Sequence, residues 1–182
     1  LTIAPENQIV KSIITNDNKK IVDKYLQKSM LKTERERLTD VKKISGVFTG
    51  SYAIHPLTNK KIPIWISDYV LSGYGTGAVM AVPCGDQRDF DFAKFFNLPI
   101  PNIFKDIDIS KNAYADKDNF KLQNSHFLND LDFKQAFEKS IKVLVSSGKG
   151  VKKINYKLRD AVFSRQRYWG EPFPVYYKKG LP

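Results

Sequence analysis

The stretch GYGTGAVMAVPCGDQRDFDFA, residues 73–93, decides much of what this chain can be. Its closely spaced glycines indicate a turn, TGAVMAVP at 76–83 is typical of a strand, and Pro83-Cys84-Gly85 indicates a second turn before a helix. The strand is apolar on both faces, so we expect it in the centre of a sheet. Asp86 and Asp89 then follow at a strand-to-helix junction. The stretch predicts two carboxylates at the mouth of a pocket that the strand lines.

The residues before this stretch add further strands. GVFTGSYAI at 46–54 and KKIPIWISDYVL at 60–71 have strand composition, and the turn signals HPLTN and SGYG follow them. LTIA at 1–4 predicts another short strand, and Pro5 is suited to the first turn of a helix.

Helical patterns occupy much of the remainder. Apolar spacing predicts helices over 5–15, 19–30, 87–97 and 133–147, with a break at 16–18. In the helix at 87–97, we expect Phe92, Phe95 and Phe96 to face the core. In the helix at 133–147, we expect an apolar stripe on the same grounds, formed by Phe133, Phe137, Ile141 and Val145. Asp130 or Asp132 should cap the fourth helix. The polar residues 105–125 predict a surface excursion.

The composition favours a folded protein with a polyanionic partner. Lys and Arg number 30 against 19 Asp and Glu, a net charge of +11, which suits nucleic acid or reflects only a lysine-rich surface. The single cysteine excludes an internal disulfide and fits a reducing compartment. No apolar run approaches the roughly 20 residues of a membrane span. Because no initiator Met or signal peptide is present, we expect a cytoplasmic piece of a longer protein.

Residues 46–71 and 73–93 together resemble the editing domain of bacterial leucyl-tRNA synthetases. The motif GTGAVMAVP followed by DQRD is typical of the leucyl enzymes, and the valyl and isoleucyl relatives have a different sequence in this strand. The resemblance implies a mixed α/β fold, with a bent, β-barrel-like sheet wrapped by helices. It also implies hydrolysis of tRNA(Leu) that carries isoleucine, valine or norvaline. A catalytically silent tRNA-docking fragment and an editing domain of a valyl or isoleucyl enzyme are the alternatives.

The resemblance also implies roles for particular residues. Asp89 would hold the α-ammonium group of the misattached amino acid through charge-assisted hydrogen bonds, although a helix-capping carboxylate would have the same local sequence. Asp86 would shape the site or cap the same helix. Tyr74, Met80 and Val82 would line the pocket for the amino-acid side chain. The turn formed by Gly75, Thr76 and Gly77 would approach the terminal adenosine of the tRNA. Core packing and a simple tight turn are the other interpretations of these residues.

Two departures from the family pattern concern the pocket. Gly85 stands where the family usually has a histidine near the terminal ribose. A threonine-rich segment, typically TTRPDT, normally precedes the strand matched here by LTIAPE. We therefore expect residues 1–150 to be an editing domain truncated at its N-terminus, with half of its pocket elsewhere.

Residues 151–182 have a basic and aromatic character. SRQRYWG at 164–170 resembles the segment by which such synthetases return from the editing insertion to the catalytic core. Arg165, Arg167 and Trp169 would contact that core or the tRNA. The ATP signatures HIGH and KMSKS do not occur, so ATP and magnesium would act in the core of the parent enzyme. We expect the rest of that chain and the tRNA(Leu) 3′ end as partners.

Other chemistries have little support. His55 and His126 are far apart, with no Cys or carboxylate at the spacing of metal ligands. Cys84 has no base beside it and is interpreted as a small turn residue. We therefore expect neither a metal nor a cofactor in this part of the enzyme.

Overall fold

A computed structural model describes residues 1–32, 43–73, 75–116 and 118–154, with the single positions 36, 176 and 178. Its contacts divide the chain into two compact units, Leu1–Val151 and Lys152–Pro182. Most of the second unit lies outside the described residues, and with it Arg165, Arg167 and Trp169. The roles expected for 1–150 and 151–182 therefore stay predictions.

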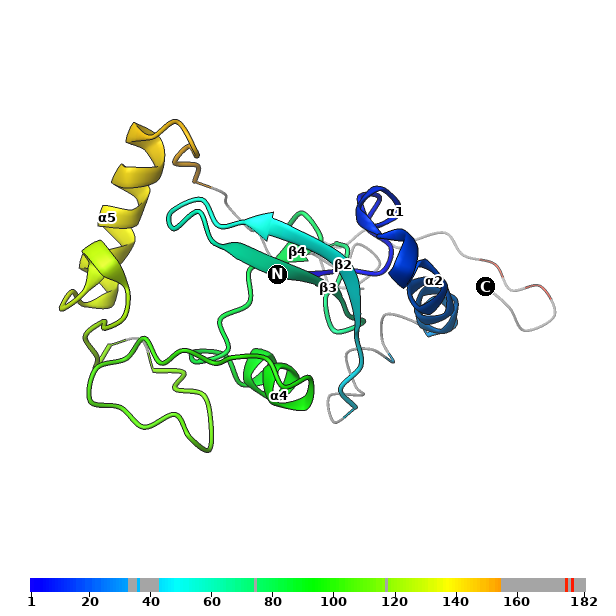
Figure 1. Ribbon diagram of the computed structural model, residues 1–182, viewed down its shortest axis with the longest axis horizontal. Coiled ribbons are helices and arrows are strands. Elements are labelled where there is room, and N and C mark those ends of the chain that lie inside the picture. Colours follow the sequence, from blue (N-terminus) through cyan, green and yellow to red (C-terminus); the bar gives the residue numbers. More distant parts are fainter. Residues whose placement is uncertain are drawn as a thin grey trace. The chain divides into compact units, whose positions relative to one another are not determined.

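The first unit contains one four-stranded sheet (Figure 1). Its order is β2-β3-β1-β4, formed by Val47–Ile54, Lys61–Ile66, Thr2–Ile3 and Ala78–Val79. β1 runs parallel to β3 and antiparallel to β4, and β2 runs antiparallel to β3. With its helices this is a mixed α/β fold, as expected. Among the described residues the sheet is open, with β2 and β4 at its edges.

The expectation that the strand at 76–83 is central is wrong. Only Ala78–Val79 pair as β4, and they pair with β1 alone among the described residues. The apolar run indicated burial on both faces, but β1 takes the place between β3 and β4. A strand of two residues with buried side chains thus holds the centre of the sheet.

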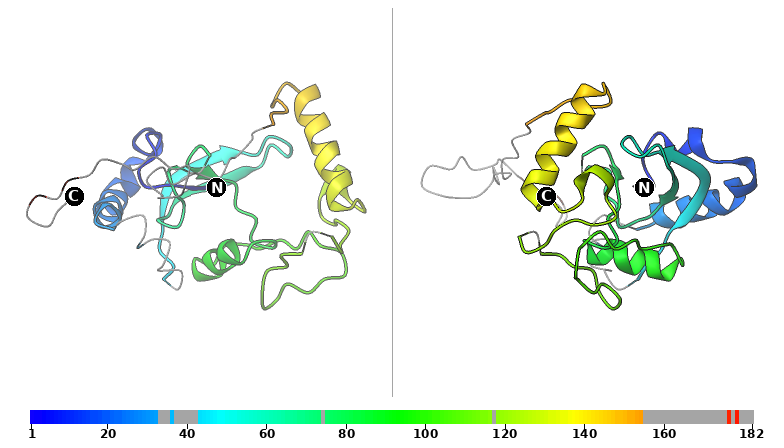
Figure 2. Two further views of the ribbon diagram at one scale, coloured as in Figure 1. Left: turned by 180° about the vertical axis from the view of Figure 1, so that it is seen from behind. Right: turned by 60° about the vertical axis from the view of Figure 1, so that its left-hand side comes forward.

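One face of the sheet carries the main core. Alternation along β3 turns Ile64 and Ile66 to this face and Trp65 to the other. Helices α1 (Val10–Ile13) and α2 (Asn16–Met30) cover it (Figure 1 and Figure 2). The buried side chains of this cluster are Ile3, Val10, Val22, Val47, Ile64 and Ile66.

The other face holds helix α4 (Gln87–Phe95) through aromatic contacts. The Trp65 ring lies 5.7 Å from the ring of Phe92 and 4.6 Å from that of Phe96. Phe95 is 61% exposed, so its expected place in the core is wrong. Around the helix, Phe95 and Phe96 lie on opposite sides of Phe92, and Trp65 packs on the side of Phe96, so Phe95 is left exposed.

The N-terminal helices differ from the predicted bounds. The helix expected over 5–15 contains only α1, because residues 5–9 form turns. The break expected at 16–18 is instead the first turn of α2, which follows Thr15. Asn18 donates from Nδ2 to Thr15 Oγ1 at 3.1 Å, so these polar residues begin a helix and do not interrupt one.

Helix α5 (Phe133–Ser146) follows a 3-10 turn, η1 (His126–Leu128). Asp132 caps it as one of the two residues expected, in a capping box with Gln135. The predicted burial of its apolar stripe is wrong, since Phe133, Phe137 and Val145 are 47%, 56% and 48% exposed. Among its described residues only Ala136 is buried.

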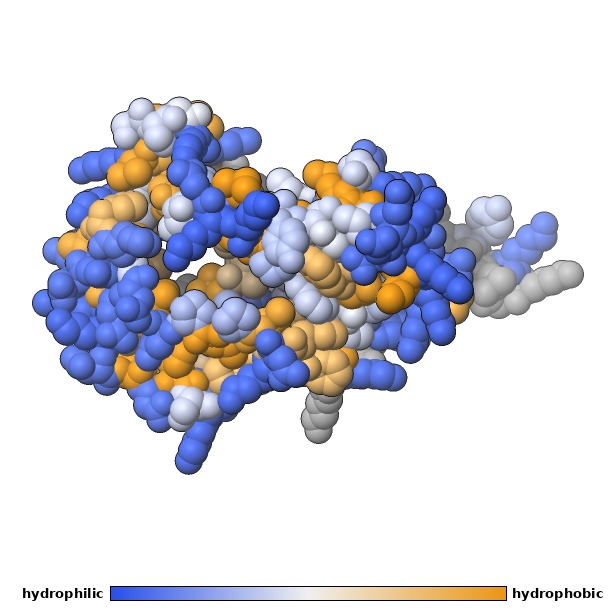
Figure 3. Space-filling view, viewed as in Figure 1, coloured by the Kyte–Doolittle hydropathy of each residue, from blue (hydrophilic) through white to orange (hydrophobic). Residues whose placement is uncertain are grey.

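The surface agrees with the composition. Hydrophilic residues predominate on the face shown in Figure 3. Within the described part of the chain, no helix combines the length and the apolar character needed to cross a membrane.

Truncation of Ile66 tests the main core. Ile66 is fully buried, whereas Ile54 in β2 is 58% exposed. We expect Ile66→Ala to lower the free energy of unfolding by about 2–5 kcal/mol, and Ile54→Ala by less than about 1 kcal/mol. Urea denaturation of the two variants measures both values. Equal losses would contradict this account of the core.

Candidate functional site

The Asp89 carboxylate connects three segments of the chain. Asp89 lies in the first turn of α4 and is only 7% exposed. Its Oδ1 accepts a hydrogen bond from the Tyr69 hydroxyl at 2.8 Å, and its Oδ2 accepts one from the Val82 amide at 2.7 Å. The carboxylate is therefore held in one orientation between the residues after β3, the residues after β4 and the helix.

The sequence left open whether Asp86 or Asp89 caps α4, and in the structure Asp86 is the cap. Its extended backbone precedes α4, and its Oδ1 accepts from the amides of Arg88 at 2.9 Å and Asp89 at 3.1 Å. An N-cap of this kind satisfies amides that have no partner inside the helix. Because Asp86 caps the helix, the Asp89 side chain is available for contacts with other segments.

Tyr69 is a site residue that the sequence analysis missed. Its hydroxyl lies 2.8 Å from Asp89 Oδ1 and 3.4 Å from Thr2 Oγ1, so it joins α4 to the central strand. Burial, with the nearby charge of Asp89, raises the pKa of Tyr69 above its ordinary value of 10.0. The hydroxyl therefore keeps its proton and stays a donor at neutral pH. The only sequence signal was a polar aromatic residue near the end of the strand predicted at 60–71.

Met80 and Val82 were expected in a strand, but both lie beyond the end of β4. Their side chains are 48% and 43% exposed, which rules out the core-packing interpretation. The Val82 amide points inward to Asp89. Two half-exposed apolar side chains thus flank a peptide that is bound to a buried carboxylate, and they can contact a ligand above it.

The glycine turn before β4 is held by the chain that follows β1. Gly75 and Gly77 have φ values of 62° and 67°, which favour glycine. Asn7 donates from Nδ2 to the Thr76 carbonyl at 2.8 Å, and the Ala4 amide donates to the Gly77 carbonyl at 2.8 Å. These bonds fix the exposed Gly75 and Thr76 beside the central strand. Tyr74 lies outside the described residues.

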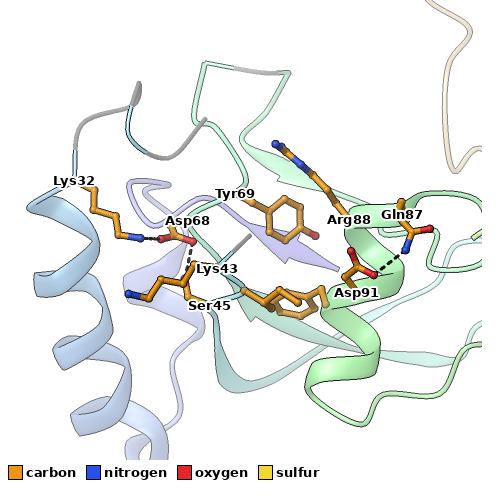
Figure 4. A pocket seen from close by; sticks show the side chains of 10 residues that line it. Lys32, Lys43, Ser45, Asp68, Tyr69, Gln87, Arg88 and Asp91 are labelled. Carbon is orange, nitrogen blue, oxygen red and sulfur yellow. Dashed lines mark hydrogen bonds and ion pairs between the residues drawn. The ribbon is translucent and has the colours of Figure 1, made fainter. Parts of the chain in front are cut away.

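A cavity of about 230 Å³ lies beside Tyr69 (Figure 4). On its wall, the buried Asp68 accepts from Lys32 Nζ at 2.7 Å and from Ser45 Oγ at 2.6 Å. This network connects the chain just after α2 to the chain just after β3. Tyr69 belongs both to this wall and to the contacts of Asp89, so the network helps to fix the tyrosine.

Nucleophilic and metal chemistry find little basis here. Cys84 is buried, and burial raises the pKa of its thiol, which opposes formation of a reactive thiolate. Among the described residues, no group of three His, Cys, Asp or Glu side chains is arranged to hold a metal ion.

Comparisons with known proteins agree on one family. The family model described as the leucyl-tRNA synthetase editing domain matches residues 1–145. Leucine–tRNA ligases of Christiangramia forsetii and Flavobacterium psychrophilum are 60% and 58% identical to this chain over its whole length. The chain spans 19% of the length of each of these relatives.

A solved structure shows the same likeness. It is the ternary complex of a leucyl-tRNA synthetase from Agrobacterium radiobacter K84 with tRNA and LeuAMS. The match has a TM-score of 0.60 and 27% sequence identity, and it covers 87% of this chain and 16% of that one.

Replacement of Tyr69 tests the buried hydrogen bond through the pH dependence of stability. Above about pH 10 an unfolded tyrosine loses its proton, while Tyr69 in the folded chain keeps it, so the wild type loses stability as the pH rises. We expect Tyr69→Phe to be less stable than the wild type at pH 8, and to lose less stability between pH 9 and pH 11. Urea denaturation at each pH measures this, with the exposed Tyr52→Phe as control. Parallel curves for Tyr69→Phe and the wild type would contradict the account.

Proposed function

Because this chain belongs to the family of leucyl-tRNA synthetase editing domains, we propose that it hydrolyses the ester of misacylated tRNA(Leu). The substrate is the 3′ end of tRNA(Leu) that carries isoleucine, valine or norvaline. Hydrolysis releases the wrong amino acid and free tRNA, which keeps the charging of leucine accurate.

The observation that carries this proposal is the setting of Asp89. Asp89 is 7% exposed, and the two donors to its carboxylate, the Tyr69 hydroxyl and the Val82 amide, are neutral. Among the described residues, no lysine or arginine forms an ion pair with it. A carboxylate has about four acceptor positions, and these two bonds occupy two of them. A pre-oriented anion with acceptor capacity left suits the α-ammonium group of an aminoacyl ester.

The neighbouring residues fit the rest of such a substrate. Met80 and Val82 are half-exposed beside the Asp89 carboxylate and would contact the amino-acid side chain. Gly75 and Thr76 present an exposed backbone turn that would approach the terminal adenosine. Tyr74 would complete the amino-acid pocket.

The reaction needs positioning more than acid–base chemistry. Water adds to the ester carbonyl, the bond from the carbonyl carbon to the ribose oxygen breaks, and that leaving oxygen takes up the proton and becomes a free ribose hydroxyl. An aminoacyl ester is already activated, so a site that holds it beside a water molecule gains rate from proximity. Asp89 acts as the anchor that sets the position of the ester.

Selectivity explains why a second site is useful. One methylene changes binding in an apolar pocket by only about 1–3 kcal/mol, and the standard examples of this limit are the isoleucyl and valyl enzymes. Isoleucine has the same atoms as leucine, so the editing pocket must distinguish the branching of the side chain. Met80 and Val82 would provide that shape.

For the full-length enzyme we propose attachment of leucine to tRNA(Leu) with ATP and magnesium in a separate catalytic core. Residues 151–182 would return the chain to that core, and Arg165, Arg167 and Trp169 would contact it or the tRNA. The cytoplasm is the proposed location.

Replacement of Asp89 in the full-length synthetase tests the anchor. We expect Asp89→Ala to lower the rate of hydrolysis of isoleucyl-tRNA(Leu) by about 100-fold or more, because the ammonium group would lose its buried partner. Asp89→Asn should also fail, since it removes the charge and keeps the shape. Leucine attachment should keep its wild-type rate. Single-turnover deacylation and aminoacylation assays measure these rates.

Asp91→Ala is the matched control. Asp91 lies on the same helix and is exposed, and its carboxylate accepts only from Gln87 at 2.7 Å among the described residues. This variant should deacylate like the wild type. An Asp89→Ala enzyme that clears isoleucyl-tRNA(Leu) at the wild-type rate would refute the role of Asp89. A wild-type enzyme with no deacylation would refute the function itself.

A further inference from the structure

A second cavity, of about 440 Å³, begins at the segment that carries the proposed editing residues. Val82, Gly85 and Asp86 line one side, and the rest of the lining comes from residues 103–122 and the first two turns of α5. Its volume is in the range of sites for small ligands. Of the described residues proposed above to contact the ester, only Val82 also lines this cavity.

The base of this aromatic cavity is firmly packed. Phe104 is buried, and its ring meets the rings of Tyr114 and Phe120 edge to face, at 5.3 Å and 4.7 Å. Cys84 and Ile109 complete the buried cluster around them. This side of the cavity is therefore formed before any ligand arrives.

The α5 side of the aromatic cavity has two phenylalanines whose rings are open to a ligand. Phe133 and Phe137 lie one turn apart, with ring centroids 6.2 Å apart and planes inclined by 23°. They are 47% and 56% exposed, unlike the buried Phe104. Aromatic faces of this kind are where unpaired nucleobases stack.

The polar groups of the aromatic cavity select the kind of ligand. Among the described residues that line it, the charged side chains are Asp86 and Asp116, and none is basic. These negative charges repel a phosphate group, even though the chain as a whole has a net charge of +11. Asp86 Oδ1 serves the helix cap, whereas its Oδ2 has no partner among the described residues. An ionised carboxylate only accepts hydrogen bonds, so it suits an exocyclic amine.

Gly85 keeps the aromatic cavity open. A Cβ at this position would lie 3.4 Å from Val82 Cγ1 and 3.5 Å from Phe104 Cζ, both on the lining. A larger side chain would therefore enter the cavity, although a methyl group would fit without displacement of its neighbours.

We propose that the aromatic cavity binds the base of the nucleotide that precedes the terminal adenosine of the tRNA. This inference rests on the proposed function, which places the terminal nucleotide at Asp89 and the Gly75–Gly77 turn. The tRNA 3′ end reads CCA, so the base is a cytosine, whose exocyclic amine reaches the Asp86 carboxylate. Phe137 and Phe133 stack against its ring, and the base holds the 3′ strand while the ester is cleaved.

A double-mutant cycle in the full-length synthetase tests this assignment. One change is Phe137→Ala, and the other replaces the penultimate cytidine of isoleucyl-tRNA(Leu) by an abasic nucleotide. Each alone should lower kcat/KM for deacylation by about 5- to 150-fold, the value of one stacked base. The two changes together should lower kcat/KM little more than either change alone, because both remove the same contact. Losses that multiply would overturn the proposal and assign Phe137 to another contact, such as one with protein.

Two further variants exclude a general effect on the fold. Phe95→Ala removes a phenylalanine that is 61% exposed on α4 and outside the cavity, and it should leave kcat/KM unchanged. Phe137→Trp should restore most of the activity, since tryptophan also stacks. Gly85→Phe should mimic Phe137→Ala by filling the cavity. Wild-type behaviour of both Phe137→Ala and Gly85→Phe would overturn the proposal.

Equilibrium binding separates this inference from the proposed function. An uncharged tRNA(Leu) minihelix is the probe, with the penultimate cytidine present or abasic, and no hydrolysis is needed. A weaker complex with the abasic probe, and no such difference for Phe137→Ala, supports the aromatic cavity even if the enzyme does not deacylate. Normal deacylation with equal binding of both probes leaves the function intact and overturns the cavity assignment.

Discussion

The Asp89 carboxylate, held by the Tyr69 hydroxyl and the Val82 amide, is the interaction on which the rest of the site depends. It joins the end of β3, the loop after β4 and the start of α4 at one buried point. The same two bonds orient an anion and turn the Val82 side chain outward. A carboxylate that was free to rotate could hold neither the fold of this junction nor the ammonium group of an ester in one position.

The short central strand makes this junction possible. Thr2 and Ile3 lie between β3 and β4, and the chain that follows them holds the glycine turn through Ala4 and Asn7. The aromatic packing of Trp65 on Phe92 fixes α4 against the other face of the sheet. The proposed editing site and the aromatic cavity both begin at the loop that these elements position, so in the proposed function one loop would contact two nucleotides of the same RNA end.

The sequence predicted the element types better than their places. The strand composition around Trp65 and the turn signals on either side indicated a strand correctly, because both depend on local sequence. The apolar run near Met80 suggested a central strand, since composition cannot show that Thr2–Ile3 takes that position from far away in the chain. Asp89 was identified through its resemblance to a family, whereas Tyr69 was missed because its contact with Asp89 arises only when β3 and α4 pack together.

The most direct test of this account is a crystal structure of the full-length synthetase with a non-hydrolysable amide analogue of isoleucyl-adenosine. The account predicts that the α-ammonium nitrogen of the analogue lies about 2.7–3.1 Å from an Asp89 carboxylate oxygen, with the Tyr69 and Val82 bonds retained. An analogue bound with its ammonium group away from Asp89, or a carboxylate that leaves Tyr69 and Val82 on binding, would contradict it.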